Sequence, residues 1–395
     1  MGYNIMRKIN HEQLSRLIQI HYNTTDSRGK KICLLVYGTY GIGKSETTMN
    51  EAQTLAEQRG KIFVVWNEIS EEKKFEVYND IEKYFIYMDI RLSEFDASDI
   101  KGLPTESTDE RFKEWLKWKV SFFAKVLEKP KCDGILLFDE INLATPLVIS
   151  SCYKILYDRI INDGKIADDV LIMGCGNLET DNAYTHNLAT PVRDRGCEVE
   201  LLAPTGEKWI DNYAIPKGVE QEIIAYILAQ PSHLQPNNID INEQKPTTAR
   251  GWARLDALIK HLKSTGKLNH AELDLISTSA IGEGIGRTFT AFWKVSQAIK
   301  IDDIIKNPSL LETIKEVDLK YFVVSSLSEK FGNKKLTFDK VIEVSEVLDK
   351  IGSAEFVALL WRLAFKYNPK AFKDGFLKDK SDIKLRFQKY LGEII

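Results

Sequence analysis

One glycine-rich loop constrains the fold of this chain more than any other feature of its sequence. Its residues are Gly38, Thr39, Tyr40, Gly41, Ile42, Gly43, Lys44 and Ser45. They match the pattern GxxxxGK[ST]. The apolar run ICLLVYG leads into the loop, and a helical pattern over 44–60 follows it. A strand, a glycine-rich turn and a helix in this order predict a phosphate-binding loop inside an α/β sheet.

Each residue type in the loop has a physical reason for its place. Glycines let backbone N–H groups turn inward around phosphates, and the positive end of the following helix favours the same anions. We expect Lys44 to reach the β- and γ-phosphates and Ser45 to ligate Mg²⁺. We also expect Glu46, the next residue, to belong to the nucleotide-binding site. The loop therefore predicts ATP and Mg²⁺ as cofactors.

A second feature is a pair of adjacent acids at the end of an apolar run. The segment GILLFDEINLATP, 134–146, places Asp139 and Glu140 directly after residues typical of a buried strand. Alone, such a pair is an ordinary strand end that meets water. Together with a phosphate loop it predicts chemistry: Asp139 would hold Mg²⁺ through water, and Glu140 would polarise the attacking water.

Three further candidate residues follow along the chain. Asn177 ends the apolar run VLIMGCGN, so its amide would lie beside the acidic pair and could orient the lytic water. Arg193 and Arg195 come shortly before the last predicted strand. Either guanidinium could serve a neighbouring subunit as an arginine finger, and we favour Arg195.

The order of the patterns predicts the domain organisation. Apolar runs near 31–37, 61–67, 84–92, 134–139, 168–177 and 197–202 alternate with helical segments. This alternation favours a doubly wound parallel α/β sheet. Helical patterns dominate from about 206 onwards. We expect a helical lead-in over 1–29, an α/β nucleotide-binding domain over 30–205, a helical lid over 206–300 and a C-terminal helical region over 301–395.

Two segments carry structural expectations only. Over 111–128, the residues Trp115, Trp118, Phe122 and Val126 recur at helical spacing and predict a helix packed on the core. The glycines of IGEGIGRTF, 281–289, do not follow a strand, so we expect them to permit close helix packing and not to form a second nucleotide site.

Bulk composition narrows the possible partners and location. The formal net charge is −3, which excludes binding of polyanions by overall electrostatics. The five cysteines are widely spaced, which is typical of reduced, mostly buried thiols. A basic and aromatic tail over 362–389 could contact single-stranded nucleic acid, but an amphipathic helical end is favoured. No apolar run is long enough to span a bilayer, so we expect a cytoplasmic protein without membrane insertion.

These motifs together resemble the AAA+ ATPases and, among them, the MoxR-like, dynein-related branch. The resemblance rests on GTYGIGKSE, DASDIKG, LLFDEINLATP, GCGNLETD, PVRDRG and KPTTARGWARL. In DASDIKG, Ser98, Asp99 and Gly102 fit a family motif that precedes a helix-2 insertion. The resemblance implies a P-loop NTPase fold with a helical lid. It also implies that Arg250 in the lid senses nucleotide.

The resemblance further implies a homo-oligomeric ATPase, a hexameric ring with nucleotide between subunits. Its expected output is chaperone-like remodelling or maturation of a partner protein, often one with a von Willebrand factor A domain. Two alternatives from other classes stay open. One is a nucleic-acid ATPase of the initiator or helicase-loader type, and the other is a nucleotide-gated scaffold with little turnover.

Overall fold

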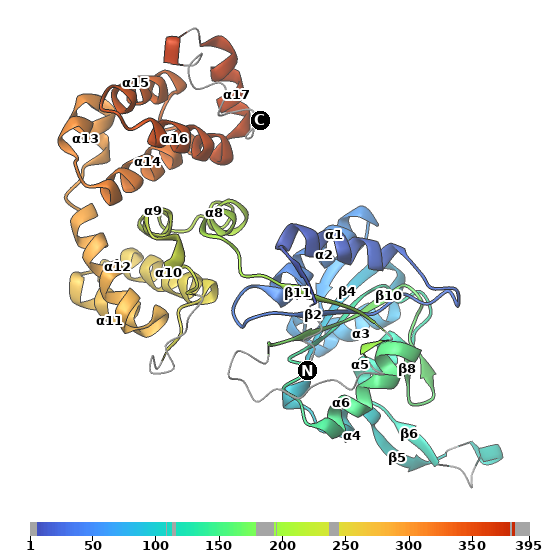
Figure 1. Ribbon diagram of the computed structural model, residues 1–395. Coiled ribbons are helices and arrows are strands. Elements are labelled where there is room, and N and C mark those ends of the chain that lie inside the picture. The colour runs from blue at the N-terminus through green and yellow to red at the C-terminus, as the bar shows by residue number, and fades with distance from the viewer. Residues whose placement is uncertain are drawn as a thin grey trace. The chain divides into compact units, whose positions relative to one another are not determined.

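The computed structural model describes residues 6–107, 109–112, 116–178, 193–194, 196–236, 245–379 and 381–383. The chain divides into two compact units, Met1–Ala203 and Pro204–Ile395. Figure 1 shows a sheet with its covering helices in the first unit and helices in the second.

Seven parallel strands form the central sheet of the first unit, in the order β1-β11-β2-β10-β7-β4-β3. Their bounds in this order are Arg7–Ile9, Cys197–Leu201, Leu34–Tyr37, Val170–Gly176, Gly134–Asp139, Tyr84–Arg91 and Ile62–Val65. Parallel neighbours require crossover connections, which place helices on the faces of the sheet. The central strands β2 and β10 are accordingly buried along their whole length.

Alternate residues of each strand supply two separate apolar cores. Leu34 and Val36 of β2 pack on one face with α1 (His11–Asn23) and α2 (Lys44–Gln58). Leu35 packs on the other face with α3 (Glu71–Asn79), α5 (Phe122–Leu127) and α6 (Pro146–Tyr153). The strand period of two thus produces a sheet covered on both sides. The predicted doubly wound parallel α/β sheet followed by helices is confirmed.

The N-terminal segment takes part in this sheet. We expected only a helical lead-in before residue 30, but β1 adds a parallel strand that pairs with β11, with Arg7 opposite Val199. After it, α1 begins with a capping box in which the side chains of Asn10 and Gln13 each accept from the other's backbone N–H. The lead-in is therefore structurally part of the first unit.

A buried carboxylate joins α1 and α2 to the sheet. Asp133, which is fully buried just before β7, accepts hydrogen bonds from Tyr22 Oη at 2.5 Å and Arg59 Nε at 2.7 Å. Lys61 Nζ lies 2.8 Å from the same carboxylate. Burial and the bond to Asp133 raise the pKa of the Tyr22 hydroxyl. Because two cations and a hydroxyl surround it, this buried charge is fully compensated.

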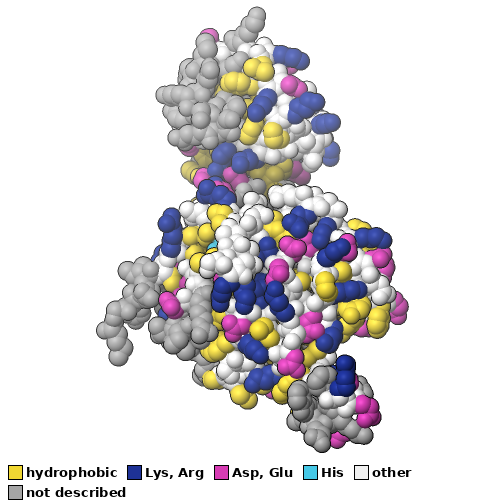
Figure 2. Space-filling view, turned by 90° about the vertical axis from the view of Figure 1, so that its right-hand side faces the viewer, with side chains coloured by type: hydrophobic (Ala, Val, Ile, Leu, Met, Phe, Trp, Pro, Cys, Tyr) yellow, Lys and Arg dark blue, Asp and Glu magenta, His cyan; other side chains and the backbone are white. Residues whose placement is uncertain are grey.

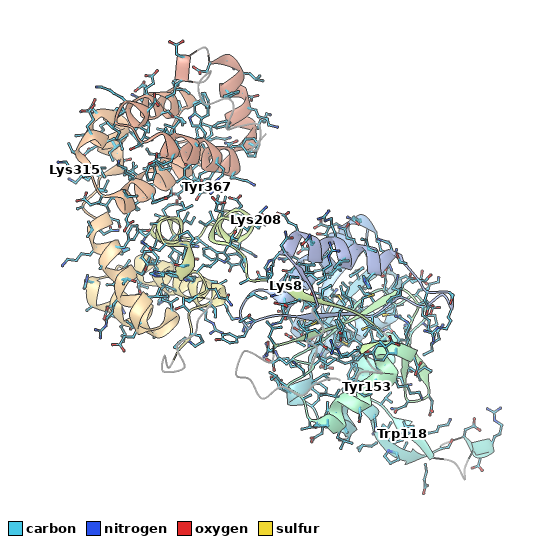
Figure 3. The ribbon with its side chains drawn as sticks, viewed as in Figure 1. Lys8, Trp118, Tyr153, Lys208, Lys315 and Tyr367 are labelled. Carbon is cyan, nitrogen blue, oxygen red and sulfur yellow. The ribbon has the colours of Figure 1, made fainter. Side chains whose placement is uncertain are left out.

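The helix predicted over 111–128 is wrong. Among the described residues, the chain instead forms a hairpin of β5 (Leu103–Glu106) and β6 (Leu116–Lys119), a short 3-10 turn at Glu110–Phe112 and the α-helix α5. Apolar Trp118 and Val120 alternate with Lys117 and Lys119, which is the period of a strand. Trp118 is 40% exposed on this hairpin, away from the core where we expected it (Figure 3). The side chain of Trp115 lies outside the described residues.

Helices make up the regular structure described in the second unit, and one apolar core runs through it from Trp209 to Ile383. They include α8 (Gly206–Trp209), α9 (Gln221–Ala229), α10 (Ala249–Ser264), α11 (His270–Ile281), α12 (Glu283–Ser296), α13 (Ile301–Lys306), α14 (Val317–Gly332), α15 (Phe338–Lys350), α16 (Ala354–Tyr367) and α17 (Pro369–Lys378). The packing role predicted for the glycines near 281–289 is confirmed, because a Cβ on Gly286 would lie 2.7 Å from the backbone of Thr278. The expected division near residue 300 stays a prediction.

Two composition-based expectations can be compared with the structure. Four of the five cysteines are buried free thiols, and Cys197 is an exposed free thiol, as predicted for a chain without a disulfide framework. Burial raises the pKa of the Cys132 and Cys152 thiols to about 12. Within the described ranges, no helix combines the length and the apolar character needed to cross a membrane.

Candidate active site

The glycine-rich loop connects β2 to α2 at the carboxyl edge of the sheet. Gly41 and Gly43 have φ values of 73° and 92°, a left-handed conformation that glycine adopts at little cost. A Cβ on Gly38 would lie 2.7 Å from the backbone oxygen of Leu201. Gly43 also caps α2 without a side-chain hydrogen bond. The first N–H groups of α2 therefore have no side-chain cap and are suited to an anion.

Lys44 is 92% buried beneath this loop, with 8% of its surface exposed. Its Nζ donates to the backbone oxygens of Gly38 at 2.6 Å and Thr39 at 3.0 Å, and to Asn177 Oδ1 at 3.2 Å. These acceptors hold the ammonium group inside the loop, where phosphate oxygens could exchange with them. The structure thus brings together two of the residues singled out in the sequence, Lys44 and Asn177.

Ser45 and Asp139 form the second contact between predicted site residues. Ser45 lies in the first turn of α2, and Asp139 is the last residue of β7. The Ser45 hydroxyl donates to Asp139 Oδ2 at 2.6 Å. Tyr87 Oη of β4 donates to the backbone oxygen of Ser45 at 3.2 Å. Hydroxyl and carboxylate oxygens are ligands that suit Mg²⁺, which commonly keeps several waters and also binds substrate phosphates.

Glu140 leaves the strand in an unusual backbone conformation. Its φ is 54°, a left-handed value that costs a non-glycine residue about 1–2 kcal/mol. Its N–H donates to Asp139 Oδ1 at 2.9 Å, and its Oε2 accepts from Ser93 Oγ at 2.5 Å. Ser93 follows β4 within a short 3-10 turn, Leu92–Glu94. Nothing in the sequence singles out Ser93, because only the fold brings it to Glu140.

A reciprocal pair of asparagines fixes the end of β10. Asn142 Nδ2 donates to the backbone oxygen of Asn177 at 2.7 Å, and the Asn177 N–H donates to Asn142 Oδ1 at 2.9 Å. Gly176 makes this possible, since a Cβ there would lie 2.9 Å from Asn142 Oδ1. The pair holds Asn177 where its side-chain oxygen reaches Lys44.

His11 is a second residue that the sequence did not reveal. From the start of α1 its Nε2 lies 2.7 Å from the backbone oxygen of Ile42, in the centre of the glycine-rich loop. Because a carbonyl only accepts, the imidazole is the donor and carries its proton on Nε2. Burial lowers the pKa of His11, and its hydrogen bond to Ile42 acts in the opposite direction. The N-terminal helix therefore supports the loop directly.

Asp89 on β4 is a third such residue. Burial raises the pKa of its carboxyl group to about 6, and the neighbouring Asp139 adds to the shift. Its Oδ1 is buried and has no hydrogen-bond partner. A pocket of about 540 Å³ lies here, lined by Asp89 together with Ser45, Glu46 and Tyr87 among others.

Of three other predicted residues, the structure describes two. Arg193 binds Glu198 of β11 through its Nε at 2.9 Å and its Nη2 at 2.7 Å. Arg195 lies outside the described residues. Arg250 lies in the second unit, exposed in the first turn of α10 after the capping residue Thr248.

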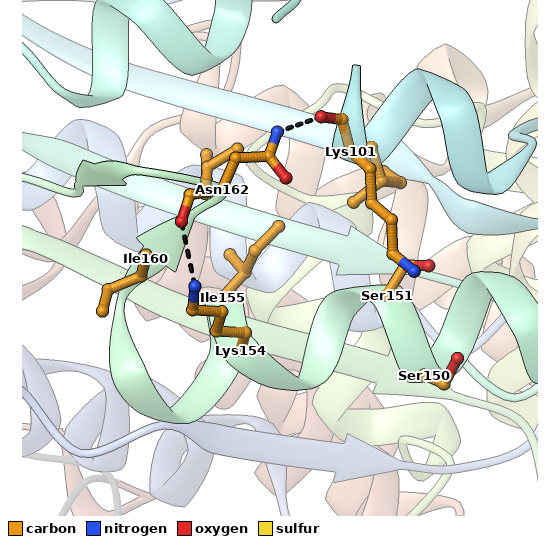
Figure 4. A pocket seen from close by; sticks show the side chains of 9 residues that line it. Lys101, Ser150, Ser151, Lys154, Ile155, Ile160 and Asn162 are labelled. Carbon is orange, nitrogen blue, oxygen red and sulfur yellow. Dashed lines mark hydrogen bonds between the residues drawn. The ribbon is translucent and has the colours of Figure 1, made fainter. Parts of the chain in front are cut away.

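A second, smaller pocket of about 250 Å³ lies near α4 (Ala97–Lys101) and α6 (Figure 4). Asn162 Nδ2 donates to the backbone oxygen of Lys101, and Lys154 Nζ donates to that of Asn162 at 2.9 Å. Several polar groups of this pocket thus bind one another, and we assign it no ligand.

Comparison with known proteins gives likeness in structure alone. No family model matches the sequence, and no curated protein matches it. The chain is similar to Cdc6p from Pyrobaculum aerophilum, with 13% identity, coverage of 100% of this chain and 96% of that chain, and a TM-score of 0.41. It is also similar to a chain of the E. coli MS115-1 HORMA:CdnC:Trip13 complex, with 14% identity, coverage of 67% and 86%, and a TM-score of 0.34. It is similar as well to AMPPCP-bound DnaA from Aquifex aeolicus, with 12% identity, coverage of 99% of this chain and 97% of that chain, and a TM-score of 0.31. Likeness at this level is too low to assign a function.

Proposed function

We propose that this chain is an ATPase of the AAA+ class that hydrolyses ATP to ADP and phosphate with Mg²⁺. The observation that carries this proposal is the connected set of contacts at the carboxyl edge of the sheet. Asn177 contacts Lys44 across the loop, and Ser45 contacts Asp139 directly. Glu140 follows Asp139 directly, and its N–H donates to Asp139 Oδ1. Candidate groups for phosphate binding, for metal binding and for general-base chemistry are thereby connected at this edge of the sheet.

The proposed roles follow from the chemistry of each side chain. Lys44 and the N–H groups at the start of α2 bind the β- and γ-phosphates. Ser45 and Asp139 hold Mg²⁺, which when bound neutralises charge that develops on the phosphates. Glu140 accepts a hydrogen bond from the attacking water and orients it, and the Asn177 amide lies beside the γ-phosphate. Glu46 lies in the first turn of α2 beside the metal ligand Ser45.

We further propose that the site is completed by a second copy of the chain within a ring. The bidentate pair of Arg193 with Glu198 supports Arg195 as the finger, since Arg193 already has a partner in its own chain. Arg250 is proposed to sense nucleotide from the helical region, and its exposure leaves it available. Movement of that region against the sheet would transmit the state of the nucleotide.

The MoxR-like branch, remodelling of a partner protein and a cytoplasmic location remain the finer proposals. The β5–β6 hairpin between α4 and α5 supports the branch, because the resemblance implied an insertion at this point. On the face drawn in Figure 2, basic and acidic side chains are interspersed. This face therefore lacks the continuous basic surface that typically binds nucleic acid.

A mixing experiment tests the ring and its shared site. Glu140→Gln and Arg195→Ala should each abolish ATP hydrolysis, because each removes a group from every site. Mixed in equal amounts, they should regain activity, since some sites then combine an intact Glu140 with an intact Arg195. The matched control is a mixture of Glu140→Gln and Lys44→Ala, in which both defects lie on the same side of the site.

Two results would contradict the proposal at different levels. If purified wild type hydrolyses ATP and the Glu140→Gln variant does so equally well, the assigned chemistry is refuted. Failure of the first mixture to recover activity, with hybrid assemblies demonstrated by mass spectrometry, would refute a site shared between copies. Specific activity that rises with protein concentration would support assembly independently.

A further inference from the structure

Asp89 lies on the strand next to the acidic pair and faces the same helix. In the register of β4 with β7, Asp89 is opposite Leu137, two residues before Asp139. Side chains two apart on a strand share a face, so Asp89 and Asp139 both face α2. By strand geometry their Cα atoms are about 8 Å apart, a separation that two carboxylates can bridge through a water or a hydrated cation. Ser45 of α2 lines the pocket that also contains Asp89.

The surroundings of Asp89 leave part of its carboxylate uncompensated. Its backbone N–H donates to Asn67 Oδ1 at 3.1 Å, but its own Oδ1 is buried without a partner. Arg91, which also lines the pocket, favours the charged form of Asp89 and lies opposite Asp139 in the strand register, but it makes its ion pair with Glu94 at 3.6 Å and not with Asp89. A buried polar atom of this kind calls for an ion or an ordered water. Asp139 nearby increases the negative charge, which strengthens the demand for a cation.

A purely structural role accounts poorly for these observations. A carboxylate that stabilises the fold normally accepts hydrogen bonds from loop N–H groups or pairs with a cation, as Asp133 does at the opposite edge of the sheet. A strand position beside α2 could have been occupied by an apolar residue like the neighbouring Tyr87 or Leu137. The half-buried carboxylate of Asp89, with one oxygen buried and unpartnered, therefore fits a bound cation better than a structural role.

We propose that Asp89 is a third acidic residue of the magnesium site and acts by holding a metal-bound water. The proposal rests on the proposed function, because it takes Mg²⁺ and nucleotide to bind beside Ser45. Asp89 is a positioning residue and not a direct ligand. Within the described part of the chain, no group of three or more His, Cys, Asp or Glu side chains is arranged to bind a metal directly. This arrangement suits Mg²⁺, which retains waters and uses one or two carboxylates.

The test measures the Mg²⁺ dependence of nucleotide binding and not catalysis. The affinity of a fluorescent ATP analogue is determined in EDTA and across a Mg²⁺ titration. Asp89→Asn keeps the size of the side chain and removes its charge. The Mg²⁺ concentration for half-maximal effect should rise about 10- to 100-fold, as for other residues that orient metal-bound groups. Affinity in EDTA should change by less than about twofold, because the phosphate loop is intact.

Glu68→Gln is the matched control, since Glu68 is an exposed acid that lines the same pocket. It should keep the Mg²⁺ midpoint of the wild type. Binding of Mn²⁺ to the nucleotide complex, followed by electron paramagnetic resonance, provides a second readout of the same affinity. Asp89→Ser replaces Asp89→Asn if the latter does not fold.

The possible outcomes distinguish failure of the proposed role of Asp89 from failure of the proposed ATPase function. If Asp89→Asn and Glu68→Gln share the wild-type midpoint, the role of Asp89 is refuted while ATP binding stands. If both variants shift equally, general pocket charge is responsible and the specific role is refuted. If wild type binds the analogue in neither condition, the proposed function fails and the role of Asp89 fails with it.

Discussion

Ser45 Oγ donates a 2.6 Å hydrogen bond to Asp139 Oδ2, which joins the first turn of α2 to the last residue of β7. The hydroxyl and the carboxylate thereby lie at hydrogen-bond distance, with the Ser45 backbone fixed in turn by Tyr87. Two groups that would hold one cation are thus preorganised by the apolar packing of α2 and β7. Little reorganisation is needed on binding, which favours affinity.

Loss of the Ser45 hydroxyl should weaken magnesium binding. Ser45→Ala removes a metal ligand, so we expect the Mg²⁺ concentration for half-maximal nucleotide binding to rise at least tenfold. Ser45→Thr is the control, because it keeps the hydroxyl and fits the loop pattern. The measurement is a Mg²⁺ titration of nucleotide affinity. If Ser45→Ala and Ser45→Thr have equal midpoints in the Mg²⁺ titration, this hydroxyl does not contact the metal.

Ser93 should affect the rate of hydrolysis and not the binding of ATP. Ser93→Ala removes the 2.5 Å bond to Glu140, a hydrogen bond to a charged group that contributes about 1.5–3 kcal/mol. We expect kcat to fall about tenfold or more while the Kd for ATP changes by less than twofold. Ser98→Ala, on α4, is a control that leaves Glu140 untouched. A parallel loss of ATP affinity in Ser93→Ala would argue for a disturbed fold instead.

His11 should make nucleotide binding sensitive to mild acid. Its folded pKa is lowered by burial from an ordinary value near 6.5, so the neutral form is favoured in the folded state. The stability contributed by neutral His11 is present above pH 6.5 and is lost as pH falls through the lower folded pKa. Protonation keeps the Nε2 donor but places a positive charge in a buried position under the loop, which destabilises the contact. We therefore expect ATP affinity to be constant above pH 6.5 and to fall at lower pH, as His11 becomes protonated.

Two substitutions isolate this effect. His11→Gln offers an amide donor that does not titrate, so its affinity for ATP should vary less than that of wild type over the same pH range. His11→Ala should weaken binding by up to about tenfold at every pH, since a hydrogen bond of about 0.5–1.5 kcal/mol is lost. Identical pH profiles for wild type and Gln would exclude His11 as the titrating group.

Asp133 should be the most costly of these positions for stability. Asp133→Ala leaves Arg59, Lys61 and Tyr22 without their common acceptor, and such a loss costs about 3–5 kcal/mol. Chemical denaturation of the wild type and the variant measures this difference. The comparison is Asp168→Ala, whose pair with Lys165 is exposed and worth about 0–1 kcal/mol. Similar unfolding free energies for the two variants would contradict the assigned role of the buried charge.

The parts of the site that could be predicted from sequence are those encoded by local order. The glycine loop and the acidic pair each combine an apolar strand with a polar turn, so the chain itself specifies their place at the strand ends. Ser93, His11 and Asp89 carry no such signal. His11 reaches Ile42 only because α1 packs on α2, and Ser93 meets Glu140 only because β4 lies beside β7.

The incorrect helix over 111–128 has a similar physical origin. Its aromatic residues satisfy a helical period, whereas Trp118 and Val120 also alternate with Lys117 and Lys119, and short apolar patterns are ambiguous between the two periods. Trp118 is partly exposed on β6, so the segment does not gain the burial of this ring that a helix packed on the core was expected to provide. The contact between Lys44 and Asn177 was easier to anticipate, because the carboxyl ends of parallel strands meet at one edge.

The pairing of β1 with β11 has a practical consequence for anyone who shortens this protein. A fragment that begins at residue 30, where the nucleotide-binding domain was expected to start, lacks β1 and α1. It would leave β11 as an unprotected edge strand, with free N–H and C=O groups that can pair with another molecule. It would also uncover the apolar surface beneath Leu14 and Ile18. Such a fragment is expected to aggregate on expression, so a productive truncation should retain the segment from Met6 onwards.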